Sequence, residues 1–276
     1  MTRIVYNRVG KAGSSAMIAL FHYLALKNNF HVESDPHFMP GQEYLLDKLT
    51  NMSQNSVYIN HCRYVELQNE ASFDDIVWIN MVREPIERQE SLYYYEVSPK
   101  RGINAQVALQ QRDRNVDPCG CMNMEFDDCY RFYLENTNCT DRLKVEQLEH
   151  YFVDSPVRNT KPRPFPQDMV YERIRNNYLF VGILEEWELS VQAFEALLPQ
   201  FFNGATEYLK SRPHHNNITP EVNKLTNTTK SGAISTHVRE ALKHYNREEV
   251  ALYERIKRLF WMKIASLFPD LADKEL

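Results

Sequence analysis

Two segments of this sequence carry cations directly after an apolar run, in a pattern suited to binding phosphate. In the first, residues 4–6 lead into a loop of small and basic residues at 8–15. In the second, residues 77–82 lead into Arg83 and a helix expected to begin near Pro85. A loop between a strand and a helix offers backbone N–H groups to an anion, and two such loops suit a ligand with two separate phosphates. The pattern therefore predicts a nucleotide site.

The first loop differs from the common ATP-binding loop, G-x-x-x-x-G-K-[ST], in which the lysine directly precedes the hydroxyl residue that holds magnesium. Here Lys11 follows Gly10, and Ser14 comes later. Residues 79–82 also contain no aspartate to hold a magnesium ion. We therefore expect phosphate to be bound by protein cations without a metal. A nucleotide kinase is the competing enzyme class, and the missing magnesium ligands disfavour it.

These segments resemble a known family. Residues 6–14 resemble the 5′-phosphosulfate loop of the uronyl 2-O-sulfotransferases and, more distantly, that of heparan sulfate 2-O-sulfotransferase. Residues 79–95 resemble the 3′-phosphate element of the same family. Two further stretches, 180–186 and 198–204, agree and stand in the family's order. The resemblance covers most of the chain and is loose after about residue 205.

The resemblance implies a P-loop-like sulfotransferase fold and transfer of a sulfuryl group from 3′-phosphoadenosine 5′-phosphosulfate to the 2-hydroxyl of a uronic acid in a glycosaminoglycan. Lys11 is then catalytic, because a cation there stabilises the negative charge that builds on the departing phosphate. Arg83 and Ser91 are eight residues apart, as the family's 3′-phosphate pair is, and are expected to bind the 3′-phosphate. The alternative role for Arg83 is an ion pair with Glu87. The expected donor-binding residues are Arg8, Lys11, Ala12, Gly13, Ser14, Ser15, Arg83, Ser91, Thr229 and Lys230.

His61 is the predicted general base. It follows the apolar residues 57–60, at the carboxyl edge of a parallel sheet where active sites lie, and it matches the family's catalytic histidine. Only a neutral imidazole accepts the proton of the attacking hydroxyl, so a rate loss on the acid side with a pKa of about 6–7 is expected. A half-buried histidine that bonds the backbone is the structural alternative.

On the acceptor side, His37 resembles a histidine in the acceptor loop of the uronyl enzymes. Lys100, Arg101 and Arg112 lie in a long irregular stretch and are predicted to contact the acidic polymer, with ordinary surface charges as the alternative. The formal net charge of −5 is the wrong sign for attracting a polyanion globally, which disfavours a nucleic-acid partner and requires a local basic groove.

The acceptor itself is left open among chondroitin, dermatan and heparan. Residues 10–14 resemble the chondroitin/dermatan-type branch, and heparan-type 2-O-sulfation is the alternative. An inactive carbohydrate-binding protein that kept the fold is the rival from another class. The joint presence of Lys11, His61, Arg83 and Ser91 disfavours that rival.

Length and composition predict one α/β domain over residues 1–276, with a mostly parallel central sheet flanked by helices. A helix after the first loop is indicated by apolar residues at helical spacing, Met17, Leu20, Phe21 and Leu24. The sequence has no run of 18 apolar residues and thus no expected membrane span. The resemblance implies a Golgi-luminal type II membrane protein, whose anchor and stem are expected to be absent here. The resemblance also allows a homotrimer, since heparan-type relatives form trimers through their C-terminal segments. The C-terminal segment of this sequence diverges from theirs.

Glycosylation and cysteine patterns favour the secretory pathway. Acceptor triplets of the type N-x-[ST] begin at Asn51, Asn138, Asn217 and Asn227. Four cysteines cluster at Cys119, Cys121, Cys129 and Cys139. The resemblance implies a disulfide between Cys129 and Cys139, and the role of the other two stays open. A zinc site is the rival, disfavoured because no histidine lies nearby before His150.

Overall fold

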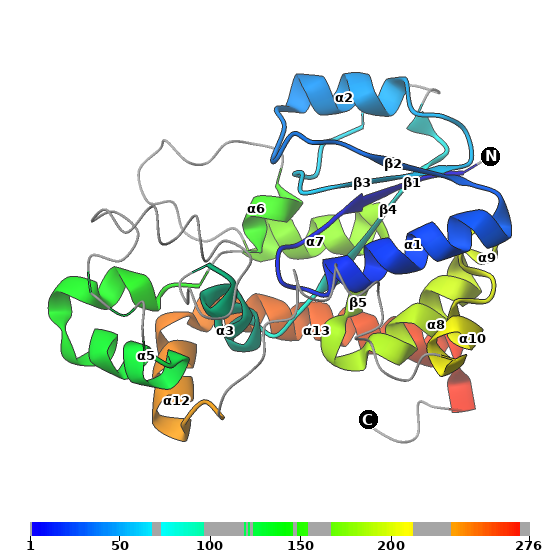
Figure 1. Cartoon of the computed structure of the whole chain (residues 1–276). Coiled ribbons are helices and arrows are strands. Elements are labelled where there is room, and N and C mark those ends of the chain that lie inside the picture. Colours follow the sequence, from blue (N-terminus) through cyan, green and yellow to red (C-terminus); the bar gives the residue numbers. More distant parts are fainter. Residues whose placement is uncertain are drawn as a thin grey trace. The chain divides into compact units, whose positions relative to one another are not determined.

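The computed structural model describes residues 2–67, 73–96, 119, 121, 124–145, 148–153, 167–211 and 233–270 (Figure 1). The chain divides into two compact units. Unit 1 comprises Met1–Val82, Gln147–Pro213 and Leu252–Leu276. Unit 2 comprises Arg83–Glu146 and His214–Ala251.

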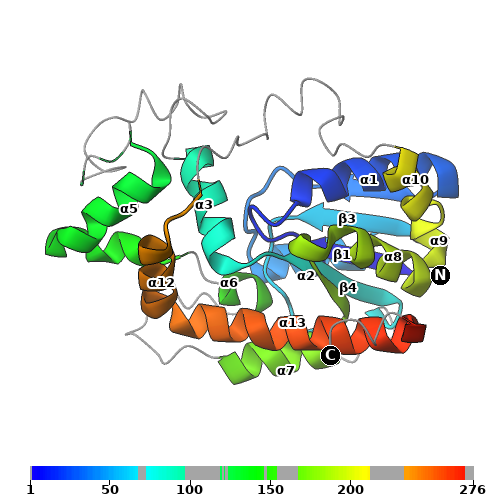
Figure 2. The same cartoon turned by 90° about the horizontal axis from the view of Figure 1, so that it is seen from below.

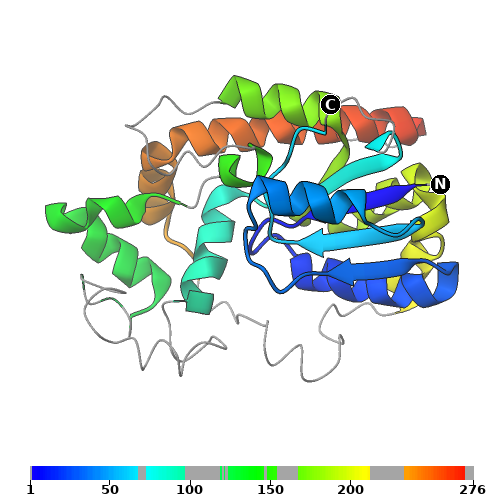
Figure 3. The ribbon, with the colours of Figure 1, turned by 90° about the horizontal axis from the view of Figure 1, so that it is seen from above.

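Unit 1 is built on a five-stranded sheet with the order β2-β3-β1-β4-β5, in which every neighbouring pair is parallel (Figure 3). The strands are β1 (Arg3–Asn7), β2 (His31–Ser34), β3 (Ser56–Asn60), β4 (Ile76–Val82) and β5 (Tyr178–Ile183). Strands β1 and β3 are buried along their whole length, as expected for a parallel sheet covered on both faces. The predicted α/β class with a parallel sheet is confirmed.

Helices cover both faces of this sheet. Figure 3 shows α2 over one face and α1 over the other. The helices of unit 1 are α1 (Ser14–Asn28), α2 (Gln42–Thr50), α6 (Glu149–Phe152), α7 (Gln167–Asn177), α8 (Trp187–Leu197), α9 (Pro199–Phe202), α10 (Ala205–Ser211) and, from Leu252 on, α13 (Arg247–Leu267). The predicted apolar stripe of α1 is confirmed, since its buried residues are Met17, Leu20, Phe21 and Leu24.

A chain of aromatic rings joins these helices to the sheet. Neighbouring ring centroids along it lie between 5.1 and 5.8 Å apart. The chain runs through Tyr6, Phe21, Phe202, Phe194, Phe180 and Phe260. Helix α13 also lies beside α7, where Arg255 pairs with Asp168 at 2.7 Å (Figure 2). Packing of large aromatic groups therefore holds the helices against the sheet, whose strand ends carry the loops.

Unit 2 is helical. It contains α3 (Pro85–Glu96), α5 (Phe126–Glu135), the 3₁₀ helix η2 (Thr137–Leu143), α12 (Thr236–Tyr245) and the first residues of α13. Asp127 accepts hydrogen bonds from the backbone N–H and the hydroxyl of Ser235, both at 2.7 Å. Ser235 is in turn the N-cap of α12. This contact fixes the start of α12 against α5.

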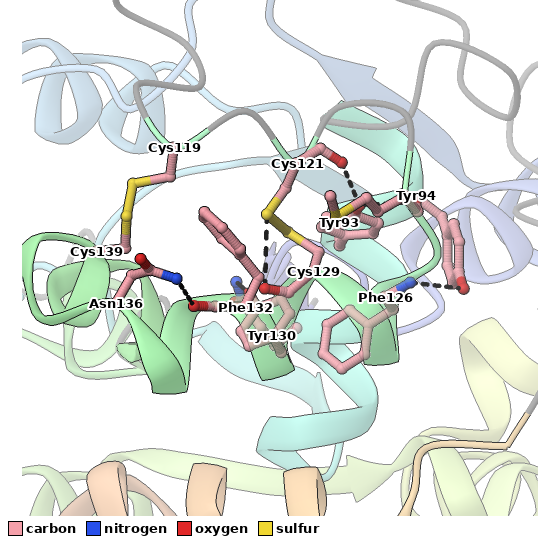
Figure 4. The surroundings of a disulfide bond; sticks show 12 residues. Tyr93, Tyr94, Cys119, Cys121, Phe126, Cys129, Tyr130, Phe132, Asn136 and Cys139 are labelled. Atoms are coloured by element: carbon pink, nitrogen blue, oxygen red, sulfur yellow. Dashed lines mark hydrogen bonds between the residues drawn. A yellow bond between two sulfur atoms is a disulfide. The ribbon is translucent and has the colours of Figure 1, made fainter.

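Two disulfides lie in unit 2 and correct the predicted pairing (Figure 4). Cys119 pairs with Cys139, with Cα atoms 6.2 Å apart, and Cys121 pairs with Cys129, with Cα atoms 5.2 Å apart. The prediction of a Cys129–Cys139 bond was wrong. Cys129 lies in the first turn of α5, and Cys139 follows its end at Glu135. Cys129 is bonded to Cys121 and Cys139 to Cys119, so neither thiol is left for the predicted bond.

The pairing also assigns Cys119 and Cys121, whose role the sequence left open. Because all four clustered cysteines are in disulfides, the rival reading of a zinc site at these residues is excluded. Disulfides persist in oxidising compartments, so the pairing is typical of a protein of the secretory pathway. No helix among the described residues is long and apolar enough to cross a membrane.

Candidate functional site

Asparagines at the strand ends of unit 1 hold the start of the first loop. Asn80 donates to the backbone oxygen of Asn7 at 2.7 Å and to its side-chain oxygen at 2.9 Å. The hydroxyl of Tyr178 donates to the same side-chain oxygen at 3.1 Å, and Asn7 donates to the backbone oxygen of Tyr151 at 2.9 Å. Asn7 and Asn80 are fully buried. A satisfied buried network of this kind is rigid, so it fixes where residue 8 leaves the sheet.

The loop itself bends sharply into α1. Lys11 and Gly13 both have positive φ, at 60° and 77°. Gly13 is the N-cap of α1 and has no side chain to cap the helix, and the first turn contains no acidic residue. A Cβ atom on Gly13 would lie 2.6 Å from Cδ1 of Leu184. The positive φ therefore favours glycine here, and a larger residue would also have to displace the end of the Leu184 side chain.

The start of α1 fits an anionic group. Ser14 and Ser15 open the helix, and the N-cap places no side chain over their N–H groups. Gly10 donates its N–H to the hydroxyl of Tyr151 at 3.2 Å, and Arg8 donates its N–H to the oxygen of Asn60 at 2.9 Å. The loop is thus tied to α6 and β3 while the helix N-terminus keeps its partial positive charge. Among the described residues, no cluster of three His, Cys, Asp or Glu side chains could hold a metal ion.

His61 follows β3 and contacts the same loop. Its Nδ1 lies 3.0 Å from the backbone oxygen of Arg8. A carbonyl oxygen only accepts, so Nδ1 must donate and Nε2 of the neutral ring keeps a lone pair. Burial lowers the pKa of the His61 imidazole from its ordinary value to about 4; the charge of Arg8 adds to the shift and the backbone hydrogen bond opposes it. The expected pKa of about 6–7 is thereby corrected, because the sequence did not reveal the burial or the nearby guanidinium.

Residues 37–39, a short segment before α2, contact His61 and its neighbour Asn60. The ring of Phe38 lies 5.3 Å from the His61 ring, centroid to centroid, and 68% of Phe38 is exposed. Met39 donates its N–H to the oxygen of His61 at 2.8 Å, and Asn60 donates to the oxygen of His37 at 2.8 Å. An exposed aromatic ring therefore lies beside the predicted base. Sequence reasoning missed Phe38, whose only signal was its position next to His37.

His37 is held by a buried carboxylate. Asp35 accepts from the backbone N–H of His37 at 2.9 Å and from the hydroxyl of Tyr44 at 2.7 Å, and it lies 2.7 Å from Nδ1 of His37. Burial alone would raise the pKa of the Asp35 carboxyl, but these hydrogen bonds lower it to about 2. A carboxylate oxygen only accepts, so in this contact Nδ1 of the His37 ring is the donor. The structure thus brings both predicted histidines to the end of β3.

The predicted 3′-phosphate residues lie in unit 2. Arg83 precedes α3, and the buried Ser91 lies within it. Arg83 pairs with Glu87 at 3.5 Å, and Arg239 donates to the same carboxylate at 2.6 Å. The alternative role of Arg83 as a partner of Glu87 is therefore present in the structure. A ligand shared by Lys11 and Arg83 stays a prediction.

Five predicted site residues lie outside the described residues. They are Lys100, Arg101 and Arg112 on the acceptor side and Thr229 and Lys230 on the donor side.

Comparison with known proteins places the chain among sulfotransferases. A family model described as the sulfotransferase family matches residues 2–254. The chain is 25% identical over 270 residues to uronyl 2-sulfotransferase of Homo sapiens, covering 94% of this chain and 62% of that protein. It is 26% identical over 217 residues to heparan sulfate 2-O-sulfotransferase 1 of Mus musculus, covering 75% of this chain and 58% of the relative. The chain thus spans about three fifths of the length of the relatives that it matches.

Proposed function

This chain belongs to the sulfotransferase family, and we propose that it transfers a sulfuryl group from 3′-phosphoadenosine 5′-phosphosulfate to the 2-hydroxyl of a uronic acid in a glycosaminoglycan of the chondroitin or dermatan type. The observation that carries this proposal is the hydrogen bond between His61 and the backbone of Arg8. It joins a neutral base to a loop that fits an anion. Transfer to a hydroxyl requires both parts, one for the proton and one for the phosphate of the donor.

The donor is proposed to lie against the loop of unit 1. The N–H groups at the start of α1 suit the 5′-phosphosulfate, with Arg8, Ala12, Gly13, Ser14 and Ser15 around it. Lys11 supplies the cation that stabilises charge on the bridging oxygen as it departs. Arg83 and Ser91 are proposed to bind the 3′-phosphate, and Thr229 and Lys230 to close over the nucleotide.

The chemistry balances with His61 as the base. A new bond forms between the sugar oxygen and sulfur while the bond between sulfur and the phosphate oxygen breaks, through a loose transition state like that of phosphoryl transfer. The hydroxyl proton passes to Nε2 of His61, and 3′-phosphoadenosine 5′-phosphate leaves. A positioned base of this kind contributes about 10²–10⁴-fold. The low pKa of His61 keeps the ring neutral and ready to accept.

The acceptor assignment rests on similarity and on the segment before α2. The match to uronyl 2-sulfotransferase covers 94% of the chain and the match to heparan sulfate 2-O-sulfotransferase 1 covers 75%, at nearly equal identity. His37 is proposed to contact the acceptor, together with Lys100, Arg101 and Arg112. Heparan-type transfer is the second candidate.

The setting of the reaction follows from the same observations. The family match runs from residue 2 to 254 and so includes parts of both units, which supports one catalytic domain. The two disulfides support a location in the secretory pathway, which we infer to be the Golgi lumen.

The test is a transfer assay with labelled donor on desulfated chondroitin, dermatan and heparan, followed by disaccharide analysis of the products. We expect label in 2-O-sulfated uronic acid, greatest for chondroitin or dermatan. In parallel, thermal unfolding should shift upward with 3′-phosphoadenosine 5′-phosphate in a chelator. A shift with ATP and magnesium alone, or label only on amino sugars, would contradict the proposal.

A further inference from the structure

A pocket of about 370 Å³ opens in unit 1 beside the start of α2. Its lining includes Pro40 and Gly41 before the helix and Arg63 and Val65 after β3. The volume lies within the range of about 300–1,000 Å³ that is typical of small-molecule sites. None of these residues was predicted from the sequence to have a function.

Arg63 is the cation of this pocket. It is half-buried, and in the part of the chain that the structure describes its side chain makes no ion pair or hydrogen bond. Glu43, the acidic residue among the described lining, is exposed. A partly desolvated guanidinium without a partner is costly, and its planar fork of donors matches a carboxylate in a bidentate manner. The pocket therefore suits a carboxylate group of a ligand.

The pocket adjoins the predicted base. Met39, whose N–H bonds the oxygen of His61, directly precedes Pro40 of the lining. Arg63 follows His61 by two residues, and the exposed ring of Phe38 lies 5.3 Å from the His61 ring, centroid to centroid. An acceptor with its hydroxyl at His61 thus meets the Phe38 ring, and the pocket lining begins one residue from Met39 and two residues from His61 along the chain.

We propose that Arg63 binds the carboxylate of a uronic acid in the acceptor chain and so selects acidic sugars over neutral ones. This inference rests on the proposed function and names a specificity residue that the sequence comparison did not supply. Arg63 acts in binding and takes no part in the proton transfer.

The test compares two acceptors, desulfated dermatan and the same polymer with its carboxylates reduced to alcohols. For the acidic polymer, Arg63→Ala should raise the acceptor KM at least about 10-fold, the loss expected for one charge-assisted hydrogen bond. Arg63→Lys should recover part of that loss, since it keeps the charge without the fork. For the reduced polymer, the wild type and Arg63→Ala should have equal KM. Arg175→Ala, which removes a surface arginine of α7, is the control and should change neither value.

Donor KM and the midpoint of thermal unfolding should stay unchanged in Arg63→Ala. Equal losses on both polymers, or no loss on the acidic one, would overturn the assignment. Calorimetry measures the binding of the two polymers in the absence of donor. It distinguishes failure of the Arg63 assignment from failure of the proposed function. Even where the wild type transfers no sulfate, tighter binding of the acidic polymer that Arg63→Ala abolishes supports the carboxylate site, and its absence refutes it.

Discussion

The Nδ1 atom of His61 lies 3.0 Å from the backbone oxygen of Arg8, so one hydrogen bond links the predicted base to the predicted donor loop. The register of the sheet produces this contact. Strands β1 and β3 pair in parallel, with Asn7 opposite Asn60. Arg8 directly follows the end of β1, and His61 directly follows the end of β3. The bond also selects the tautomer, since Nδ1 carries the proton and leaves Nε2 free for the acceptor.

Lys11→Ala should lower turnover by roughly 100- to 1,000-fold. The variant loses the cation at the departing oxygen, a loss of about 3–4 kcal/mol in barrier by comparison with oxyanion donors. Binding of 3′-phosphoadenosine 5′-phosphate should weaken less than turnover, because the charge on the bridging oxygen develops in the transition state. Lys48→Ala on α2 is the matched control and should leave both unchanged. Retention of more than a tenth of wild-type turnover would refute the role of Lys11.

Gly13→Ala should destabilise the protein by about 1–3 kcal/mol and weaken donor binding, because alanine disfavours φ of 77° and its Cβ meets Leu184. Gly41→Ala is the control. Gly41 has φ of −65° and open space around its Cβ position, so only the small N-cap preference is lost. Urea unfolding measures the free energy of unfolding of the two variants. Equal losses in the two variants would show that the loop conformation is not the cause.

Arg83→Ala and Ser91→Ala should each weaken binding of 3′-phosphoadenosine 5′-phosphate by about 10-fold or more, while binding of adenosine 5′-phosphate changes little. Calorimetry with the two nucleotides isolates the 3′-phosphate. Glu87→Gln distinguishes the alternative, since Glu87 pairs with both Arg83 and Arg239. If Glu87→Gln reproduces the effect of Arg83→Ala on both nucleotides, Arg83 serves the structure of unit 2.

Peptide mapping without reductant should recover Cys119 joined to Cys139 and Cys121 joined to Cys129. Cys62 is the free thiol, and burial raises its pKa. A maleimide should therefore label about one thiol per chain only after unfolding. Recovery of a Cys129–Cys139 peptide, or rapid labelling of the native protein, would contradict the structure.

The sequence predicted the sheet and the loop because both depend on local patterns. Apolar runs such as residues 77–82 mark buried strands, and the spacing from Met17 to Leu24 marks the face of α1. The position of His61 followed from the rule that sites lie at the carboxyl ends of parallel strands.

The remainder depended on tertiary contacts. Disulfide connectivity cannot be deduced from cysteine spacing alone, and the structure pairs Cys129 with Cys121 where the resemblance suggested Cys139. Phe38 and Arg63 lie in segments without periodicity, so only the fold brings them to His61 and to the pocket. The pKa of His61 is set by burial and by Arg8, which the sequence does not place.

The role of His61 is tested most directly by the pH dependence of sulfuryl transfer in the wild type and in His61→Ala. Neutral imidazole is the active form and its pKa is about 4, so the wild-type rate should stay level as pH falls from neutral and then drop through about pH 4. His61→Ala should lower turnover by at least about 100-fold, remove that acid limb and leave binding of 3′-phosphoadenosine 5′-phosphate nearly intact. A variant that keeps both the rate and the acid limb would contradict the assignment of His61 and move the base elsewhere, with His37 the next residue to replace.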